Sequence, residues 1–135
     1  MEIKQVTVIG SGLMGSGIAQ VIATAGFRVN LFDSYPEALD KGKSGIEKSL
    51  ARLVKAGRMK SEDQNLVMER IMFYMEMEPS LKGSQLVIEA DRGISLRVGL
   101  RLLAHQYYLW LCVERLKLLR LLPLLQIRMI LPYLQ

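Results

Sequence analysis

The glycine-rich hexamer Gly10–Gly15, which reads Gly-Ser-Gly-Leu-Met-Gly, restricts the possible folds of this chain more than any other feature. The β-branched run Ile3–Ile9 ends directly before it, and the small and apolar segment Leu13–Ala25 begins inside it. A short apolar run bounded by glycine predicts a buried strand, whereas a longer segment without breakers predicts a helix. Gly26 follows at the position where a glycine commonly ends a helix. The hexamer is therefore expected to connect a strand to a helix.

The rest of residues 1–90 continues this alternation of strands and helices. Short apolar runs predict further strands at Arg28–Phe32, Ile71–Tyr74 and Leu86–Glu89. Amphipathic patterns predict helices over residues 36–57 and from 61 to 69 or 70, and Ser61 is expected to cap the second one. Strands that alternate with helices indicate a parallel, doubly wound sheet. The predicted fold class is α/β, a Rossmann-type sheet that is truncated and carries an atypical Leu/Arg-rich C-terminal tail.

The order of the glycines in the hexamer, G-x-G-x-x-G, is typical of a dinucleotide-binding loop when it lies between a strand and a helix. Gly10 allows the tight turn after the strand, and Gly12 lacks the Cβ that would keep a pyrophosphate at a distance. Gly15 allows the helix to pack closely against the strand. The first N–H groups of the helix, those of Leu13 and Met14 among them, would then point toward the phosphates. These residues form the predicted phosphate-binding loop.

Asp33 stands at the end of the second predicted strand, 21 residues after Gly12. A carboxylate at this point of the motif accepts hydrogen bonds from the ribose hydroxyls of the adenosine. It would repel a 2′-phosphate, so the predicted cofactor is NAD rather than NADP, and Arg28 lies on the wrong side of Asp33 to bind that phosphate. Two alternatives remain open. One is FAD on the same fold, and the other is a sharp turn whose nearby carboxylate only caps a loop.

The positive net charge of the chain belongs to its last third. Residues 1–90 contain 11 basic and 11 acidic residues, whereas residues 91–135 contain 7 basic residues and only Asp91 and Glu114 as acidic ones. The chain lacks the uniform basic face that binds the phosphates of a nucleic acid, so no nucleic-acid partner is expected.

Cys112 is the only cysteine, which excludes an internal disulfide, and no signal-peptide pattern opens the chain. A cytoplasmic location is therefore expected.

Beyond Ala90 the composition changes to a tail rich in leucine and arginine. Residues 91–135 include 15 leucines, and charges interrupt the pattern every few residues. The longest uncharged apolar stretch, Tyr107–Val113, is too short to cross a bilayer, so no transmembrane segment is expected. An amphipathic helix that lies on a membrane or on a partner protein is one alternative for this tail.

Several segments of the first two-thirds of the chain resemble the 3-hydroxyacyl-CoA dehydrogenases, 3-hydroxybutyryl-CoA dehydrogenases included. The resemblance rests on Val6–Ala19, Gly26-Phe27, Gly45–Leu50 and Leu86–Ala90. It implies NAD-dependent oxidation of a (3S)-3-hydroxyacyl-CoA to the 3-ketoacyl-CoA, as in fatty-acid β-oxidation or butanoate metabolism. It also implies an acyl-CoA partner molecule and a homo-oligomeric assembly. Another NAD-dependent β-hydroxyacid dehydrogenase and a non-catalytic dinucleotide-binding module remain as alternatives.

The resemblance also implies roles for three residues outside the glycine-rich hexamer. By position, Ser49 and Lys55 would contact the CoA, although a solvent-exposed helix face explains them equally well. Glu89 would lie near the cofactor at the end of its strand, or else be an ordinary strand-end residue. No residue of this chain matches the catalytic His–Glu pair of the family, because the only histidine, His105, lies in different surroundings. We therefore expect no catalytic residue and no metal site in this chain.

The resemblance ends near residue 90, which divides the chain into a partial NAD-binding domain, 1–90, and a tail, 91–135, that is unlike the family. Gly93 stands where the family has a second glutamate, and the family's Asn-Thr-Ser-Ser segment and mainly helical second domain have no counterpart. A change of reading frame near residue 90 would explain the tail, and the family-like sequence would then continue in another frame of the gene. The chain alone is expected to be inactive. It is also expected to have low stability, because the apolar faces of its strands lack the later strands that would normally pack beside them.

Overall fold

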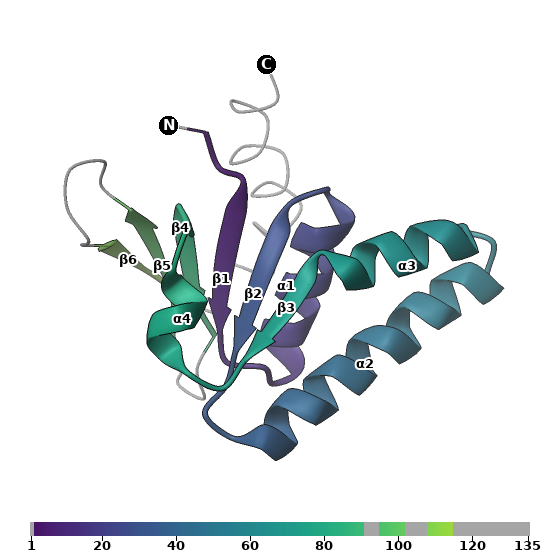
Figure 1. The fold of residues 1–135 in the computed structure, drawn as a ribbon, viewed down its shortest axis with the longest axis horizontal. Coiled ribbons are helices and arrows are strands. Elements are labelled where there is room, and N and C mark those ends of the chain that lie inside the picture. The colour runs from purple at the N-terminus through teal and green to yellow at the C-terminus, as the bar shows by residue number, and fades with distance from the viewer. Residues whose placement is uncertain (1, 91–94, 102–107, 115–135) are drawn as a thin grey trace.

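A computed structural model of the chain describes residues 2–90, 95–101 and 108–114, and a six-stranded sheet lies at its centre (Figure 1). The order of the strands across the sheet is β3-β2-β1-β4-β5-β6. β5 (Ser95–Arg101) pairs antiparallel with β4, and β6 (Tyr108–Glu114) pairs antiparallel with β5. The other four strands are parallel to one another: β1 (Gln5–Ile9), β2 (Arg28–Phe32), β3 (Ile71–Tyr74) and β4 (Leu86–Glu89). These four have the doubly wound order that the sequence predicts.

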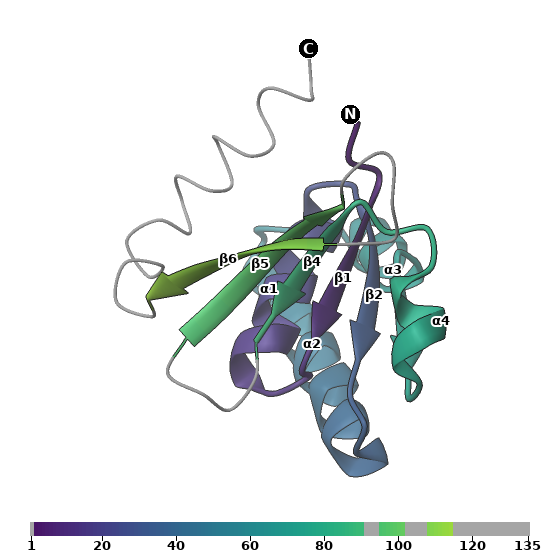
Figure 2. The same cartoon turned by 90° about the vertical axis from the view of Figure 1, so that its left-hand side faces the viewer.

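Helices cover both faces of the parallel part of the sheet. They are α1 (Leu13–Thr24), α2 (Pro36–Lys55), α3 (Ser61–Glu69) and α4 (Met77–Leu81). Successive side chains of a strand point to opposite faces. Val6 and Val8 of β1 belong to the core under α1, α2 and α3, whereas Thr7 between them hydrogen-bonds to Ser80 of α4. Helix α4 therefore lies on the face opposite to the other three helices. Figure 2 shows α1 and α4 on opposite sides of the sheet.

The hydrophobic core lies between the sheet and helices α1, α2 and α3. Leu31 of β2 and Ile46 and Leu50 of α2 are fully buried in it, and Leu53 packs against it from a partly exposed position. Each leucine or isoleucine side chain buried in this way contributes about 1.5–3 kcal/mol. The face of α2 that the amphipathic pattern predicts to be buried is therefore the face that packs into the core beside α1 and α3.

The end of α1 is made by Gly26, as the sequence predicts. Gly26 has a φ of 102°, its N–H donates to the Ala23 carbonyl, and the N–H of Phe27 donates to the Ile22 carbonyl. These two bonds form a Schellman motif, in which the residue after the C-cap adopts the left-handed conformation that glycine takes without strain. The chain then turns directly into β2.

A buried polar cluster attaches α4 to the sheet. The Thr7 hydroxyl donates to the Ser80 carbonyl and lies 2.6 Å from the Ser84 hydroxyl, and the Asn30 side-chain amide donates to the same carbonyl at 2.7 Å. All four residues are buried. In the part of the chain that the structure describes, no buried side-chain nitrogen or oxygen lacks a hydrogen-bond partner. The cluster therefore avoids most of the free-energy cost of burying polar groups.

The structure differs from the sequence-based predictions in several places. β1 begins at Gln5 rather than at Ile3, and α2 ends at Lys55 rather than at Gly57. Ser61 does not cap α3, because Lys60 is the N-cap residue, no side chain caps this helix, and Ser61 is already helical. The five-residue helix α4 is too short to show a hydrophobic period. The tail contains β5 and β6, for which the Leu/Arg pattern predicts no strand, so these two segments do not form the amphipathic helix considered as an alternative. His105 and the other residues of the tail lie outside the described residues.

Candidate dinucleotide-binding site

The carboxyl ends of the parallel strands place the predicted cofactor residues at one edge of the sheet, the carboxyl edge. β1 leads into the glycine-rich loop (Gly10–Gly15), and β2 leads into Asp33. The N–H of Gly10 donates to the Phe32 carbonyl at 2.8 Å, and the N–H of Ala90 donates to the Ile9 carbonyl at 2.8 Å. In sheets of this kind ligands bind where the strand order reverses, which here is between β1 and β4. The loop lies at that point.

Gly10 and Gly15 bring the first turn of α1 into contact with the end of β1. Gly10 has a φ of 97°, a left-handed conformation that favours glycine. A Cβ built on Gly15 would lie 1.7 Å from the Gly10 carbonyl oxygen and 3.6 Å from the Cβ of Ala90. No side chain fits at that distance from a backbone atom. Gly15 therefore allows the close packing of helix against strand that the sequence predicts.

Gly12 faces open space at the start of α1. Its φ of −62° and ψ of −172° are extended values that any residue adopts, and a Cβ built on it would meet no atom within 4 Å. Nothing in the described part of the chain therefore requires a glycine at this position. A glycine at an open position suits a loop whose backbone is approached by a group from outside the protein.

The N-terminus of α1 offers backbone donors that the helix itself does not use. The first helical hydrogen bond runs from the Ser16 N–H to the Gly12 carbonyl at 2.9 Å, and Gly12 provides no side-chain cap. The N–H groups of Leu13, Met14 and Gly15 precede this bond and have no intrahelical acceptor. Together with the positive end of the helix dipole, they favour an anionic group such as a phosphate.

The side chains of Leu13 and Met14 have different surroundings. Leu13 is 96% exposed, whereas Met14 is partly buried and packs against the hydrophobic core. Much of the Met14 side chain is therefore taken up by contacts with the core. Leu13 can offer both its N–H and an apolar side chain.

Asp33 lies beside the glycine-rich loop, and donors of Ser11 and Tyr35 hold its carboxylate. The Oδ2 atom accepts from the N–H and from the hydroxyl of Ser11, both at 2.9 Å, and the Oδ1 atom accepts from the N–H of Tyr35 at 3.0 Å. The carboxylate therefore faces the loop. Ser11 is a functional candidate that the motif does not reveal, because the second position of G-x-G-x-x-G accepts any residue.

Glu89 completes the predicted cofactor residues. It is half-buried and pairs with Ile9 in the register of β1 and β4, so it lies next to the point where β1 enters the loop. The carboxyl edge of the sheet thus carries all the residues predicted to bind the cofactor, namely Gly10, Gly12, Leu13, Met14, Gly15, Asp33 and Glu89.

The two residues predicted to contact CoA lie on different sides of α2. A Cβ built on Gly42 would lie 2.6 Å from the Ser11 carbonyl oxygen, so this side of α2 touches the glycine-rich loop. Ser49 follows Gly42 by about two helical turns, which places it on the same side, and it is half-buried. Lys55 is exposed and is rotated from Ser49 by about 120° around the helix axis. Only Ser49 is therefore on the loop side of α2.

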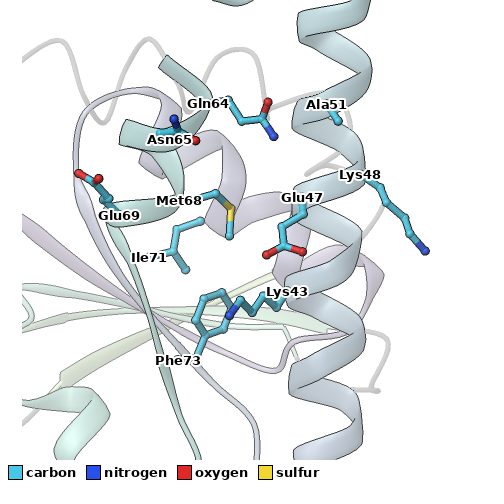
Figure 3. A pocket seen from close by; sticks show the side chains of 10 residues that line it. All are labelled: Lys43, Glu47, Lys48, Ala51, Gln64, Asn65, Met68, Glu69, Ile71 and Phe73. Atoms are coloured by element: carbon cyan, nitrogen blue, oxygen red, sulfur yellow. The ribbon is translucent and has the colours of Figure 1, made fainter. Parts of the chain in front are cut away.

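A groove of about 790 Å³ lies between α2, α3 and β3 (Figure 3). The Nζ atom of Lys43 lies 5.6 Å from the centre of the Phe73 ring, which is a cation–π contact. None of the residues that line the groove belongs to the carboxyl edge or is predicted to contact CoA. They are Lys43, Glu47, Lys48, Ala51, Gln64, Asn65, Met68, Glu69, Ile71 and Phe73. The groove is therefore a surface separate from the candidate cofactor site.

Two features are not found among residues 2–90, 95–101 and 108–114. No three side chains of His, Cys, Asp or Glu gather in the way that a metal ion would require. No helix in these ranges combines the length and the apolar character needed to cross a membrane.

A comparison with protein families identifies the part of the chain that carries this geometry. The sequence model described as "3-hydroxyacyl-CoA dehydrogenase, NAD binding domain" matches residues 5–91. This range contains β1 to β4, α1 to α4 and the whole carboxyl edge described above. The chain belongs to the 3-hydroxyacyl-CoA dehydrogenase family. Its matched part is the family's NAD-binding domain, so the predicted resemblance and the predicted cofactor, NAD, are confirmed.

Individual members of the family are similar to the same part of the chain. A probable 3-hydroxybutyryl-CoA dehydrogenase of Bacillus subtilis is 42% identical over 90 residues, which cover 67% of this chain and 31% of the relative. The mitochondrial hydroxyacyl-coenzyme A dehydrogenase of Mus musculus is 58% identical over 53 residues, which cover 39% of this chain and 17% of the relative. The chain therefore spans about a third or less of the length of these curated relatives.

Solved structures of family members have the same fold. The crystal structure of FadB2 from M. tuberculosis matches with a TM-score of 0.65 at 37% identity, covering 67% of this chain and 32% of that protein. The 3-hydroxybutyryl-CoA dehydrogenase of Escherichia coli K12 matches with a TM-score of 0.65 at 35% identity, covering 70% of this chain and 20% of that protein. The predicted Rossmann-type α/β fold is therefore confirmed for the matched part.

Proposed function

We propose that this chain binds NAD at the carboxyl edge of its sheet. Asp33 would accept hydrogen bonds from the hydroxyls of the adenosine ribose, and its charge would repel the 2′-phosphate of NADP. Glu89 would lie beside the cofactor at the end of β4. The pyrophosphate would lie over the N-terminus of α1, against the backbone of Gly10, Gly12, Leu13, Met14 and Gly15.

The observation that carries this proposal is the contrast between Gly15 and Gly12. Packing against Gly10 explains the glycine at position 15, whereas the space around Gly12 is open in the described part of the chain. Beside that space begins a helix whose first three N–H groups have no intrahelical acceptor. An open backbone position next to these donors fits an anionic group such as a pyrophosphate.

We further propose that this domain serves an enzyme that oxidises a (3S)-3-hydroxyacyl-CoA to the 3-ketoacyl-CoA. When bound, NAD accepts the hydride that leaves the substrate. The residues of this chain would bind and orient the cofactor, and the chain alone would be inactive, because we assign none of its residues to the proton transfer. The names of the relatives, which are 3-hydroxybutyryl-CoA and 3-hydroxyacyl-CoA dehydrogenases, support this substrate class.

The CoA part of the substrate would contact α2. Ser49 is the stronger candidate for this contact, because it lies on the side of α2 that touches the glycine-rich loop. Lys55 is the weaker candidate, because it lies on a different side of the helix and is exposed.

For the whole enzyme we propose a place in fatty-acid or butanoate metabolism, β-oxidation included. We propose a cytoplasmic location, since a single cysteine requires no oxidising compartment.

We infer that the NAD-binding domain ends near residue 90 and that a change of reading frame produced residues 91–135. The end of the family match at residue 91 supports this inference, as does the abrupt change to a Leu/Arg-rich composition. The nucleotide sequence beyond codon 90 tests it. A family-like continuation in another frame is expected, and its absence would refute the frame change.

Titration calorimetry of NAD with the wild-type chain, Asp33→Ala and Asp40→Ala tests the cofactor site. Asp33→Ala should weaken NAD binding roughly 10- to 100-fold, because hydrogen bonds to a charged group contribute about 1.5–3 kcal/mol. Asp40 is an exposed carboxylate on α2, so Asp40→Ala should bind NAD as the wild type does. NADP should bind more weakly than NAD to the wild type, and Asp33→Ala should narrow that difference. Equal affinity of the wild type and Asp33→Ala for NAD would refute the site.

A further inference from the structure

Ser11 is buried between the glycine-rich loop and Asp33. Its side chain is 1% exposed, so it offers no surface to a ligand. Both of its donors are directed at one atom, since the N–H and the hydroxyl of Ser11 each lie 2.9 Å from the Oδ2 atom of Asp33. Hydrogen bonds to a charged acceptor are shorter and stronger than those between neutral groups. Ser11 therefore fixes the Asp33 carboxylate to the loop that precedes α1.

Helix α2 holds Ser11 in place from the other side. A Cβ built on Gly42 would lie 2.6 Å from the carbonyl oxygen and 3.1 Å from the Cβ of Ser11, so the helix backbone lies directly against this residue. The start of α2 also contributes to the arrangement, because the N–H of its N-cap residue, Tyr35, donates to the Oδ1 atom of Asp33 at 3.0 Å. The carboxylate is thus held at both oxygens before any ligand arrives.

We propose that Ser11 is a positioning residue for Asp33 and thereby determines the specificity of the site for an adenosine ribose that carries its hydroxyls. The inference rests on the proposed function, since it concerns the residue that orients the proposed ribose contact. A carboxylate that is already held in place before the ligand binds loses less conformational entropy when it accepts hydrogen bonds from the ribose hydroxyls. An alanine at position 11 keeps the N–H donor but removes the hydroxyl, which leaves the carboxylate with one donor fewer and more freedom to rotate.

The experiment compares two ligands in four variants of the full chain. The ligands are NAD and an NAD analogue with 2′,3′-dideoxyadenosine, and the variants are Ser11→Ala, Asp33→Ala, the double variant and Thr24→Ala. Thr24 is a matched control, because it is exposed and its hydroxyl donates to the Gln20 carbonyl within its own helix, α1, at 2.7 Å. Ser11→Ala should weaken NAD binding roughly 3- to 10-fold. It should change the affinity for the analogue by less than about twofold, because the analogue has no ribose hydroxyls that could donate hydrogen bonds to Asp33.

A double-variant cycle separates positioning from a general effect on the loop. In the Asp33→Ala background, Ser11→Ala should change NAD affinity by less than about twofold, because the residue it positions is gone. If Ser11→Ala weakens NAD and the analogue equally, or weakens NAD equally in both backgrounds, Ser11 only stabilises the loop and the proposal is wrong. If Ser11→Ala binds NAD like Thr24→Ala and the wild type, the proposal is wrong as well.

The outcome for the wild type separates this proposal from the proposed function. A wild-type chain that does not bind NAD would contradict the proposed function itself. In that case amide hydrogen exchange of the ligand-free chain still tests whether Ser11 and Asp33 are hydrogen-bonded to each other. Exchange of the Ser11 N–H should be faster in Asp33→Ala than in the wild type, since its acceptor is lost. Equal exchange rates would show that Ser11 does not hold Asp33.

Discussion

At the scale of single residues, the glycines of the loop lack side chains for different physical reasons. Gly10 needs a left-handed backbone, with a φ of 97°. Gly15 has no room for a Cβ, which would lie 1.7 Å from the Gly10 carbonyl oxygen. Gly12 has ordinary backbone angles and open space around it in the described part of the chain. Two of these glycines therefore serve the fold, and we propose that the third leaves room for the pyrophosphate of NAD.

Alanine substitutions at Gly15 and Gly12 should separate stability from binding. Gly15→Ala should lower the free energy of unfolding by about 1–3 kcal/mol, because the added methyl group must displace the Gly10 carbonyl. Gly12→Ala should lower it by no more than about 1 kcal/mol, since nothing is displaced and only the weaker N-cap preference of alanine counts. Gly12→Ala should nevertheless weaken NAD binding at least about tenfold, because a Cβ would hold the pyrophosphate away from the backbone.

Urea denaturation and NAD titration measure these two effects. A loss of stability in Gly12→Ala as large as that in Gly15→Ala would contradict the open environment of position 12. Unchanged NAD affinity in a stable Gly12→Ala variant would contradict the approach of a pyrophosphate to this backbone.

At the scale of the elements, α2 is placed by glycines in its interior as well as by its apolar face. A glycine inside a helix costs about 0.5–1 kcal/mol relative to alanine, so its presence calls for a reason. For Gly42 the reason is the contact of its backbone with Ser11, whereas a Cβ on Gly45 would meet no described atom within 4 Å. The same helix thus contains one glycine that its packing requires and one that its packing does not.

Alanine at these two positions should change stability in opposite directions. Gly45→Ala should raise the free energy of unfolding by about 0.5–1 kcal/mol, because alanine is the better helix former. Gly42→Ala gains the same helix propensity but must displace Ser11, so it should lower the free energy of unfolding by about 1–3 kcal/mol. Thermal or urea denaturation of both variants gives the comparison. Equal effects of the two substitutions would show that α2 does not depend on its contact with the loop.

At the scale of the whole molecule, the candidate site and the tail occupy separate parts of the chain. Every residue proposed to bind NAD lies between Gly10 and Glu89, whereas β5 and β6 extend the sheet beyond β4. β5 pairs with the edge of β4, so without it β4 would become an edge strand. Unpaired edge strands favour association with other chains. The tail should therefore influence association more than cofactor binding.

Removal of residues 91–135 tests this separation. The shortened chain should bind NAD within about twofold of the affinity of the full chain, because all proposed contacts remain. It should also aggregate at lower protein concentration, because the edge of β4 is exposed. Titration calorimetry and light scattering measure the two properties. A large loss of NAD affinity would contradict the separation and favour a tail with a function of its own.

Much of the fold follows from short patterns in the chain. The bounds predicted for β2, β3 and β4 are those observed, because each is a short run rich in β-branched, aromatic and other apolar residues. The glycine-rich loop and Asp33 follow from the spacing of a known motif. The predicted cap at Ser61 is wrong, because the helix begins one residue earlier than a capping serine would allow. Helix α4 and strands β5 and β6 have no clear pattern from which to predict them.

By itself the sequence determined strands β1 to β4 and helices α1 to α3, and where the loop and the carboxylate at position 33 lie along the chain. The spacing of apolar residues and of glycines predicts these features, because local structure depends mainly on residues a few positions apart in the chain. Only the tertiary structure decided that Ser11 holds Asp33, that Gly42 touches Ser11, and that Thr7 anchors α4. These contacts join distant parts of the chain, and they exist only once the parallel strands have paired in register.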